Sequence, residues 1–345
     1  MILREQVLLA EHTTLRVGGT ARWLALCTND SDIVSALAFA QEQELPVAVL
    51  GGGSNTLAPD AGFSGLVIKI DLKGITFVED AVTPLVTAGA GESWDALVRV
   101  AGERSLWGIE NLAGIPGTVG GAVVQNIGAY GAELSTSCMS VETLSLQTRE
   151  RRHIEHREEM FGYRTSLFKA SPDLIVTQVT LRLSRAPASV LSYPDLQRAL
   201  AEGKSFETPE DVAQVVRSIR EKKFPQKEGS AGSFFKNPVV SHAQALELAK
   251  QYPELPQFKT KDGVKVSLAW LLDHALHLTG LRHGGARLYE RQPLVIATEE
   301  GSSADDVASL ADEVKKIVAE KCGIHIEREV ETISAKNKSY PHASE

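Results

Sequence analysis

Short apolar runs punctuated by glycine and proline fill the first half of the chain. The runs PVAVL, GLVIKI and PLVTAGA are typical of strands that are connected by tight turns. Residues 32–44 instead show helical spacing, and the apolar run that follows at residues 46–50 is typical of a buried strand. This β-α-β order predicts a mixed α/β fold.

A strand, a boundary and a helix are predicted next. Residues 174–183 (LIVTQVTLRL) alternate as a strand does, and residues 184–189 (SRAPAS) indicate a boundary. Thr208 can cap a helix that has Pro209 at its first position and Asp211 in its first turn. One face of this helix would carry Val212, Val215, Val216 and Ile219.

One more helix and one more strand precede the tail. Residues 303–320 have apolar side chains at helical spacing, and Gly323 stands just past the expected end. Residues 324–333 are predicted to form a strand. The tail SAKNKSYPHASE lacks apolar residues to bury, so we expect residues 334–345 to be disordered.

Length and charge narrow the class of protein. A chain of 345 residues is longer than a domain with one compact core usually is, so we expect two or three subdomains. No stretch is long and apolar enough to span a bilayer, and Arg4 and Glu5 interrupt the apolar N-terminus, which argues against a secretory signal. The net charge of −8 disfavours nucleic acid and anionic membranes as partners, although a local basic pocket stays open. We therefore expect a cytoplasmic protein.

The three cysteines indicate neither a disulfide framework nor a metal site. Cys27, Cys138 and Cys322 are an odd number and lack the spacing of metal ligands. We expect three reduced thiols and no bound metal.

Two segments are dense in glycine. In the first, LGGGSN at residues 50–55, a buried strand leads into three glycines whose N–H groups could cradle a diphosphate. No helix follows, which excludes a Rossmann fingerprint, and a simple tight connection is the alternative. The second, residues 111–131, is explained either by a flat cofactor lying on bare backbone or by a crowded crossing of strands.

These segments carry a resemblance to a known family. LGGGSN followed by NLAGIPGTVGGAVVQNIGAYG resembles the UDP-N-acetylenolpyruvoylglucosamine reductases, the MurB family of bacterial wall synthesis. The similarity continues in His12-Thr13-Thr14, YRTSLFK, SAGSFFKNP and IEREVETI, so it covers nearly the whole chain.

The resemblance implies an α+β fold with three parts. A FAD-binding region like that of vanillyl-alcohol oxidase would comprise two α/β subdomains, residues 1–70 and 71–205. A substrate-binding α/β domain would follow at residues 206–333, with residues 324–333 returning toward the flavin site. A monomeric enzyme would hold FAD non-covalently, use NADPH as reductant, and reduce UDP-N-acetylglucosamine enolpyruvate to UDP-N-acetylmuramate.

The resemblance also assigns residues to the cofactor and to catalysis. Arg164 matches the catalytic arginine, Ser233 the proton donor, and Glu329 the acidic residue that supports the same intermediate, for which a raised pKa is expected. A surface ion pair, a turn serine and an exposed strand carboxylate are the respective alternatives. The FAD contacts would be Gly51, Gly52, Gly53, Ser54, Asn55, Gly114, Ile115, Pro116, Gly117, Thr118, Gly120, Gly121, Ala122, Gln125 and Asn126.

Substrate contacts follow from the same resemblance. Tyr193 would lie on a loop that folds over the substrate in the longer branch of the family. Lys223 ends a helix that also carries Arg217, Arg220 and Lys222, and this cluster could face a diphosphate or complement the helix C-terminus. Asn237 and Gln292 are further candidates, and Phe258 stands near a position where the family often has a tyrosine.

Two rival functions make different demands on the sequence. An oxidase of the same fold would need a covalent flavin anchor, usually a histidine near the glycine segments, and those segments contain none. A flavin or UDP-sugar binding module without catalysis would not need Arg164, Ser233 and Glu329 together.

Overall fold

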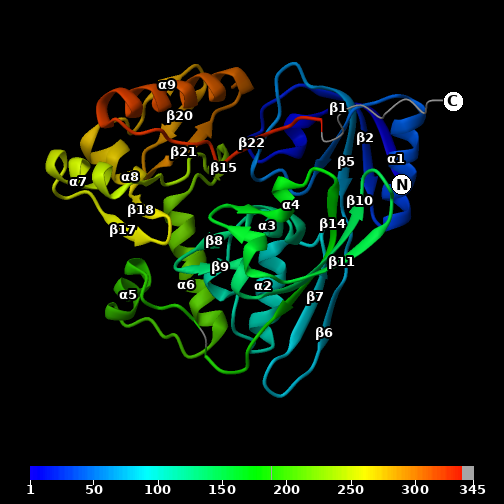
Figure 1. Cartoon of the computed structure of the whole chain (residues 1–345), viewed down its shortest axis with the longest axis horizontal. Coiled ribbons are helices and arrows are strands. Elements are labelled where there is room, and N and C mark those ends of the chain that lie inside the picture. Colours follow the sequence, from blue (N-terminus) through cyan, green and yellow to red (C-terminus); the bar gives the residue numbers. More distant parts are fainter. Residues whose placement is uncertain (188, 336–345) are drawn as a thin grey trace.

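The computed structural model describes residues 1–187 and 189–335, which form three regions built on four sheets of three to five strands (Figure 1). In the first region, β1 pairs antiparallel with β2, while β5 pairs parallel with both β2 and β3. Helix α1 packs on this sheet. The bounds are β1 Ile2–Leu8, β2 Thr20–Cys27, α1 Asp30–Glu42, β3 Val47–Leu50 and β5 Phe63–Ile70.

The second region is built on a five-stranded antiparallel sheet in the order β11-β10-β14-β7-β6. Helices α2 and α3 pack beside it, and α6 packs against α2 (Figure 1). The strands are β6 Ile75–Val78, β7 Leu85–Gly89, β10 Cys138–Ser145, β11 Arg151–Glu155 and β14 Leu174–Arg182. The helices are α2 Trp94–Glu103, α3 Val119–Gln125, α4 Leu167–Ala170, α5 Pro194–Ala201 and α6 Pro209–Lys223.

The third region has a four-stranded sheet, β15-β21-β20-β19, and a three-stranded sheet, β16-β18-β17. Its strands are β15 Gly229–Ser233, β16 Val239–Val240, β17 Gln257–Thr260, β18 Gly263–Val266, β19 Arg282–His283, β20 Ala286–Tyr289 and β21 Gln292–Thr298. Its helices are α7 His242–Gln251, α8 Leu268–Trp270 with a π-helical turn at Leu271–Ala275, and α9 Ala304–Cys322.

Three short strand pairs complete the described fold. Two are hairpins, β8 Gly128–Ala129 with β9 Ala132–Glu133 and β12 Phe161–Gly162 with β13 Thr165–Ser166. The third is parallel and joins distant parts of the chain, β4 Thr56–Leu57 with β22 Glu331–Thr332. No helix in the described residues is long and apolar enough to cross a membrane.

Helix caps account for how closely the helices match the sequence prediction. Helix α6 begins at Pro209 with a capping box between Thr208 and Asp211, as the sequence predicts. Helix α9 ends at Gly323, which takes a left-handed conformation with φ of 65°. Helix α1 starts two residues earlier than predicted, because the Asn29 side chain caps it.

The predicted strand at residues 324–333 is wrong for most of its length. Only Glu331–Thr332 form a ladder. Before it the chain alternates in burial, but it forms only one isolated antiparallel bridge, between Arg328 and Phe235, with backbone bonds to residues 234 and 236. Of the predicted tail, the structure describes only residues 334 and 335, so that prediction falls mainly outside the described residues.

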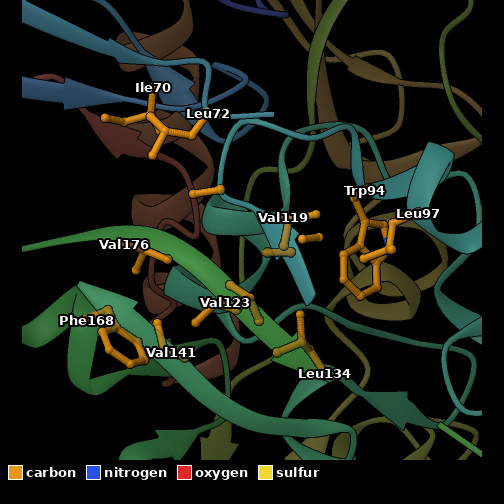
Figure 2. Close-up of a cluster of buried hydrophobic side chains, with 14 of the residues drawn as sticks. Ile70, Leu72, Trp94, Leu97, Val119, Val123, Leu134, Val141, Phe168 and Val176 are labelled. Carbon is orange, nitrogen blue, oxygen red and sulfur yellow. The ribbon is translucent and has the colours of Figure 1, made fainter. Parts of the chain in front are cut away.

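The first two regions share one large hydrophobic core. Figure 2 shows part of it, in which Ile70 and Leu72 belong to the same cluster as side chains of α2, α3 and the second sheet. Val212 and Val216 of α6 also lie in this core. The sequence places α6 in the third region, but its apolar face packs with the second.

The core of the third region includes two residues from the beginning of the chain. Leu15 and Val17 are 0% and 2% exposed and pack with the side chains of β15, β21 and α9. The N-terminal segment therefore belongs structurally to two regions at once.

Replacing Leu15 with alanine should reveal this contribution. We expect Leu15→Ala to lower the free energy of unfolding by about 2–5 kcal/mol, because a buried leucine is replaced by a cavity. Leu8→Ala, at a position that is 44% exposed, is the control and should cost less than about 1 kcal/mol. Urea unfolding of the cofactor-free protein followed by circular dichroism measures both, and equal losses would contradict the packing of Leu15.

Candidate functional site

A cavity of about 360 Å³ lies where the three regions meet. The two glycine segments line one part of it, α3 another, and residues near both ends of the third region close it. The volume falls in the range of ligand pockets, about 300–1,000 Å³. Its lining mixes bare backbone, aliphatic side chains and a few charged groups, which suits a large planar cofactor with a polar tail.

The two glycine segments touch one another directly. A Cβ atom on Gly52 would lie 2.8 Å from the Cα of Gly117, and one on Gly117 would lie 2.4 Å from Ser54 Oγ. Gly121 differs, because its Cβ would meet only Thr118 Oγ1, at 3.4 Å, and it lines the cavity. Crowding therefore explains some of the glycines, while others leave backbone open to a ligand.

Two polar side chains of the first segment hold neighbouring backbone in place. Ser54 Oγ donates to the carbonyl of Pro116 at 3.0 Å, which ties the glycine segments together. Asn55 Nδ2 donates to the carbonyl of Glu329 at 3.1 Å, and its own carbonyl accepts from Glu331 N–H at 3.1 Å. The LGGGSN segment thus also fixes the C-terminal part of the site.

The side chains of Arg164 and Glu329 meet at the cavity. Arg164 occupies the turn between β12 and β13 with a positive φ of 57°, and its Nε lies 3.2 Å from Glu329 Oε1. Its Nη2 donates to the carbonyl of Gly128. A Cβ on Gly128 would lie 2.8 Å from Arg164 Nη1, so this glycine makes room for the guanidinium.

Gln125 at the end of α3 extends this network. Its Nε2 donates to Glu329 Oε1 at 3.1 Å, and its Oε1 accepts from Lys169 Nζ at 3.0 Å. Lys169 also pairs with Glu331 at 2.7 Å. The site therefore carries two cations and two carboxylates linked through one amide.

Burial raises the pKa of Glu329, and the neighbouring Arg164 opposes this shift without cancelling it. The raised pKa agrees with the expectation from sequence. A carboxyl group in this state can hold a proton at a higher pH than an exposed one, so it can serve as a hydrogen-bond donor or share a proton.

Ser233 is the last residue of β15 and also lines the cavity. The ladder between β15 and β21 is irregular between Ser230 and Ser233, where Gly232 has a positive φ of 72°. In the described part of the chain, nothing hydrogen-bonds to the Ser233 hydroxyl. The hydroxyl is therefore free to contact a ligand.

Thirteen of the residues expected to bind the cofactor line the cavity, and two do not. Gly114 lies behind it, with its N–H donating to Asp95 at 2.6 Å and its carbonyl accepting from Arg220 at 3.0 Å. Asn126 ends α3 in a left-handed conformation and is buried, with its Nδ2 donating to the carbonyl of Gly162. Both residues shape the walls from outside.

None of the four residues expected to bind substrate lines this cavity. Tyr193 precedes α5 and packs edge-on against Tyr130, with ring centroids 5.3 Å apart. Lys223 pairs with Asp195 at 2.6 Å. Asn237 Oδ1 accepts from the N–H of Leu268, and Gln292 begins β21.

The basic residues of α6 have separate environments. Arg217 is buried in ion pairs with Asp95 at 2.9 Å and Glu210 at 3.1 Å, so it fixes α6 to α2. Arg220 lines the cavity, and burial lowers its pKa. Of the cluster named in the sequence, the cavity lining includes only Arg220.

The sequence prediction missed several residues of the site, among them Lys169 and Trp94. Lys169 lies in the YRTSLFK motif, which could have singled it out. Trp94 has no such signal, since its indole is buried beneath the cavity and donates to the carbonyl of Leu112 at 2.9 Å.

Phe258 is 53% exposed on β17, and Lys265 Nζ lies 5.9 Å from its ring. No cluster that could hold a metal occurs among the described residues.

Comparisons with known proteins agree with this architecture. Residues 21–150 match the FAD binding domain, and residues 224–333 match the UDP-N-acetylenolpyruvoylglucosamine reductase C-terminal domain. These matches and the mixed α/β sheets confirm the expected fold class.

Similar proteins cover nearly the whole chain. A UDP-N-acetylenolpyruvoylglucosamine reductase of Pseudomonas aeruginosa is 39% identical over 95% of this chain and 98% of its own length. That of Escherichia coli is 36% identical over 93% and 94%. The crystal structure of the Thermus caldophilus enzyme superposes with a TM-score of 0.65 at 30% identity, over 96% of this chain and 99% of that one. The chain therefore belongs to the UDP-N-acetylenolpyruvoylglucosamine reductase (MurB) family.

Proposed function

We propose that the chain reduces UDP-N-acetylglucosamine enolpyruvate to UDP-N-acetylmuramate, the step that supplies the lactyl ether of peptidoglycan precursors. FAD is its bound cofactor and NADPH its reductant. The observation that carries this proposal is the convergence of Arg164, Ser233 and Glu329 on a cavity that the two glycine segments also line. A flavin-binding module without catalysis would not need this convergence.

The cofactor fits the residues that are present. The glycine segments offer bare backbone at Gly51, Gly52 and Gly121, and Arg220 places a buried cation at the lining. In the described residues, no histidine or cysteine lines the cavity, which supports a non-covalent flavin and disfavours an oxidase with a covalent anchor. When bound, FAD supplies the hydride chemistry of both half-reactions.

The protein must stabilise the charge that hydride addition creates on the substrate. Addition at the terminal carbon of the enolpyruvyl group leaves an enolate conjugated with the substrate carboxylate. The guanidinium of Arg164 is placed to meet this charge, since it lines the cavity and its turn is fixed by Gly128 and Glu329. Fixed donors of this kind typically contribute about 3–4 kcal/mol each.

Ser233 then transfers its hydroxyl proton to the enolate carbon. The C–H bond forms as the O–H bond breaks, and the serine alkoxide regains a proton afterwards. Serine is a weak acid, so the step depends on the basic enolate and on nearby positive charge. Glu329, with its raised pKa, shares its proton with the intermediate and limits the negative charge that builds up beside it.

The position of Tyr193 supports the longer branch of the family, in which a tyrosine loop covers the substrate. The loop is held to α6 by the ion pair of Lys223 with Asp195, and Tyr193 packs on Tyr130. We also propose that the protein acts in the cytoplasm as a monomer.

A spectrum and an oxidation assay test the function. The purified protein should show flavin absorbance, and NADPH oxidation should depend on the enolpyruvyl UDP sugar. A colourless protein that cannot be reconstituted with FAD, or oxidation indifferent to that sugar, would contradict the proposal.

Ser233→Ala should separate the two half-reactions. Reduction of the flavin by NADPH should continue, while its reoxidation by the enolpyruvyl sugar should slow by about 10²–10⁴-fold, the usual contribution of a general acid. Stopped-flow absorbance measures both rates. Ser35→Ala, at an exposed position of helix α1, is the matched control. Equal loss of both half-reactions in Ser233→Ala would refute the role of proton donor.

Glu329→Gln should change how stability depends on pH. An acid whose folded pKa lies above its unfolded value binds more protons in the folded state, so the free energy of unfolding falls as pH rises above the ordinary value of 4.5. The wild type should therefore lose stability relative to Glu329→Gln as pH rises above about 4.5, by at most about 1.4 kcal/mol per pH unit. Urea unfolding across this range measures the difference. Glu327→Gln, at an exposed neighbouring position, should run parallel to the wild type, and a constant offset for Glu329→Gln would contradict the raised pKa.

A further inference from the structure

We propose that residues 12–16 act as a spacer that sets the position of Ser233 relative to the cofactor loop, residues 51–55. Thr298, which does not line the cavity, is the positioning residue that fastens this spacer to the strand of Ser233. The inference rests on the proposed role of Ser233 as proton donor. It adds a part of the chain that does not line the cavity.

One side of the spacer holds the cofactor loop. The N–H of Thr14 donates to the carbonyl of Gly53 at 3.1 Å. Gly53 has a positive φ of 71°, and a Cβ on it would lie 2.1 Å from the carbonyl oxygen of His12. The loop therefore approaches the spacer more closely than any residue with a side chain could.

The other side of the spacer holds β15. The N–H of Ser230 donates to the carbonyl of Thr14 at 2.8 Å. A Cβ on Gly229 would lie 2.3 Å from the carbonyl oxygen of Leu15 and 2.2 Å from Thr298 Oγ1. Gly53 and Gly229 thus both pack closely against the spacer, each at a position where a side chain could not fit.

Thr298 fixes the second contact. Its Oγ1 donates to the carbonyl of Leu15 at 2.6 Å, and both residues are buried. In β21, Thr298 stands opposite Gly229, so the hydroxyl, the spacer carbonyl and the glycine meet at one point. Without the hydroxyl, a buried carbonyl would lose this partner, which costs free energy and favours a shift of the backbone.

The spacer itself has little freedom to adjust. Leu15 and Val17 are fixed in the core of the third region. Between them, Arg16 takes a positive φ of 55° in a turn that is closed by a hydrogen bond from the N–H of Arg16 to the carbonyl of Thr13. The exposed Arg16 Nη1 adds a bond to the carbonyl of Lys227 at 2.8 Å, just before β15.

Only two residues separate the fastened Ser230 from Ser233. Ser230 Oγ accepts from the N–H of Gly232 at 3.2 Å, which closes the irregular turn between them. A shift of Ser230 is therefore passed to Ser233 with little room for compensation. Misplacement of a reacting group by about 1 Å can slow a reaction by about 10²-fold, so the hydroxyl of Thr298 acts on the rate from outside the cavity.

Two matched pairs of side chains at position 298 test the spacer. Thr298→Val keeps the branched shape of threonine and removes the hydroxyl. Thr298→Ala and Thr298→Ser form a pair with smaller side chains that differ only in the hydroxyl. The effect of the hydroxyl can therefore still be measured if the Thr298→Val variant does not fold. Each variant is assayed as the FAD-loaded enzyme by stopped flow, and its dissociation constant for FAD is measured by titrating cofactor-free protein.

Loss of the hydroxyl should affect one half-reaction. Reoxidation by the enolpyruvyl sugar should slow at least about tenfold in Thr298→Val relative to wild type, and in Thr298→Ala relative to Thr298→Ser. Flavin reduction by NADPH and the dissociation constant for FAD should stay within about twofold, because the cofactor loop keeps its own contact with Thr14. Unchanged reoxidation, or equal loss in both half-reactions, would overturn the proposal.

Ser233→Ala measured in parallel separates this inference from the proposed function. If Ser233→Ala slows reoxidation and the hydroxyl at position 298 does not matter, the spacer is refuted and the proton donor stands. If Ser233→Ala leaves reoxidation unchanged, the proton donor is refuted, and the spacer proposal that rests on it falls as well.

Discussion

The site depends on one residue, Glu329, which all three regions hold in place. The backbone carbonyl of Glu329 accepts a hydrogen bond from Asn55 of the first region, and its side-chain carboxyl group contacts Gln125 and Arg164 of the second. Its N–H donates to the carbonyl of Phe234 in the third at 2.7 Å. A change in the relative position of any two regions would break at least one of these bonds. The chemistry and the assembly of the regions therefore use the same residue.

Burial gives this carboxyl its chemical character, and the surrounding polar groups keep that burial from being too costly. A buried ionised carboxylate without partners would be strongly unfavourable. Here the amide of Gln125 and the guanidinium of Arg164 compensate in part, and the pKa still stays raised. The side chain of Arg164 is in turn held by the backbone, since its Nη2 donates to the carbonyl of Gly128. The site is stable enough to form and still holds a carboxyl that can keep its proton.

Local sequence signals located the three helices that were predicted, α1, α6 and α9, to within about two residues, because caps are local interactions. Thr208 with Asp211, and Gly323, fix the ends of α6 and α9 through contacts within a few residues. The segment before β22 shows the limit. Its alternation of Ile324, Ile326 and Val330 predicts a strand, but a strand needs a neighbour along its length. In the described residues this segment forms a ladder only at Glu331–Thr332 and a single bridge, between Arg328 and Phe235. No local pattern contains that information.

The candidate site shows the same division. Arg164, Ser233 and Glu329 could be named because they stand in motifs that resemble a family, and the fold brings them to one cavity. The placement of α6 could not be predicted, because the buried pair of Arg217 with Asp95 joins residues 122 positions apart. The sequence could not decide whether the glycines serve close backbone packing or leave backbone open to a cofactor, because the structure contains both cases. Gly52 packs closely against Gly117, whereas Gly121 lines the cavity.

Ser233 illustrates why residues far apart in sequence must cooperate at such a site. On one side, Ser230 is bound to Thr14, near the beginning of the chain. On the other, the carbonyl of Phe234 accepts from Glu329, close to the C-terminal end of the described chain. A serine hydroxyl has little acidity of its own, so its usefulness as an acid depends on being held at one place relative to the substrate carbon and the surrounding charges. The strand that carries Ser233 is short and irregular, and these two flanking contacts supply the rigidity that the ladder alone would not give it.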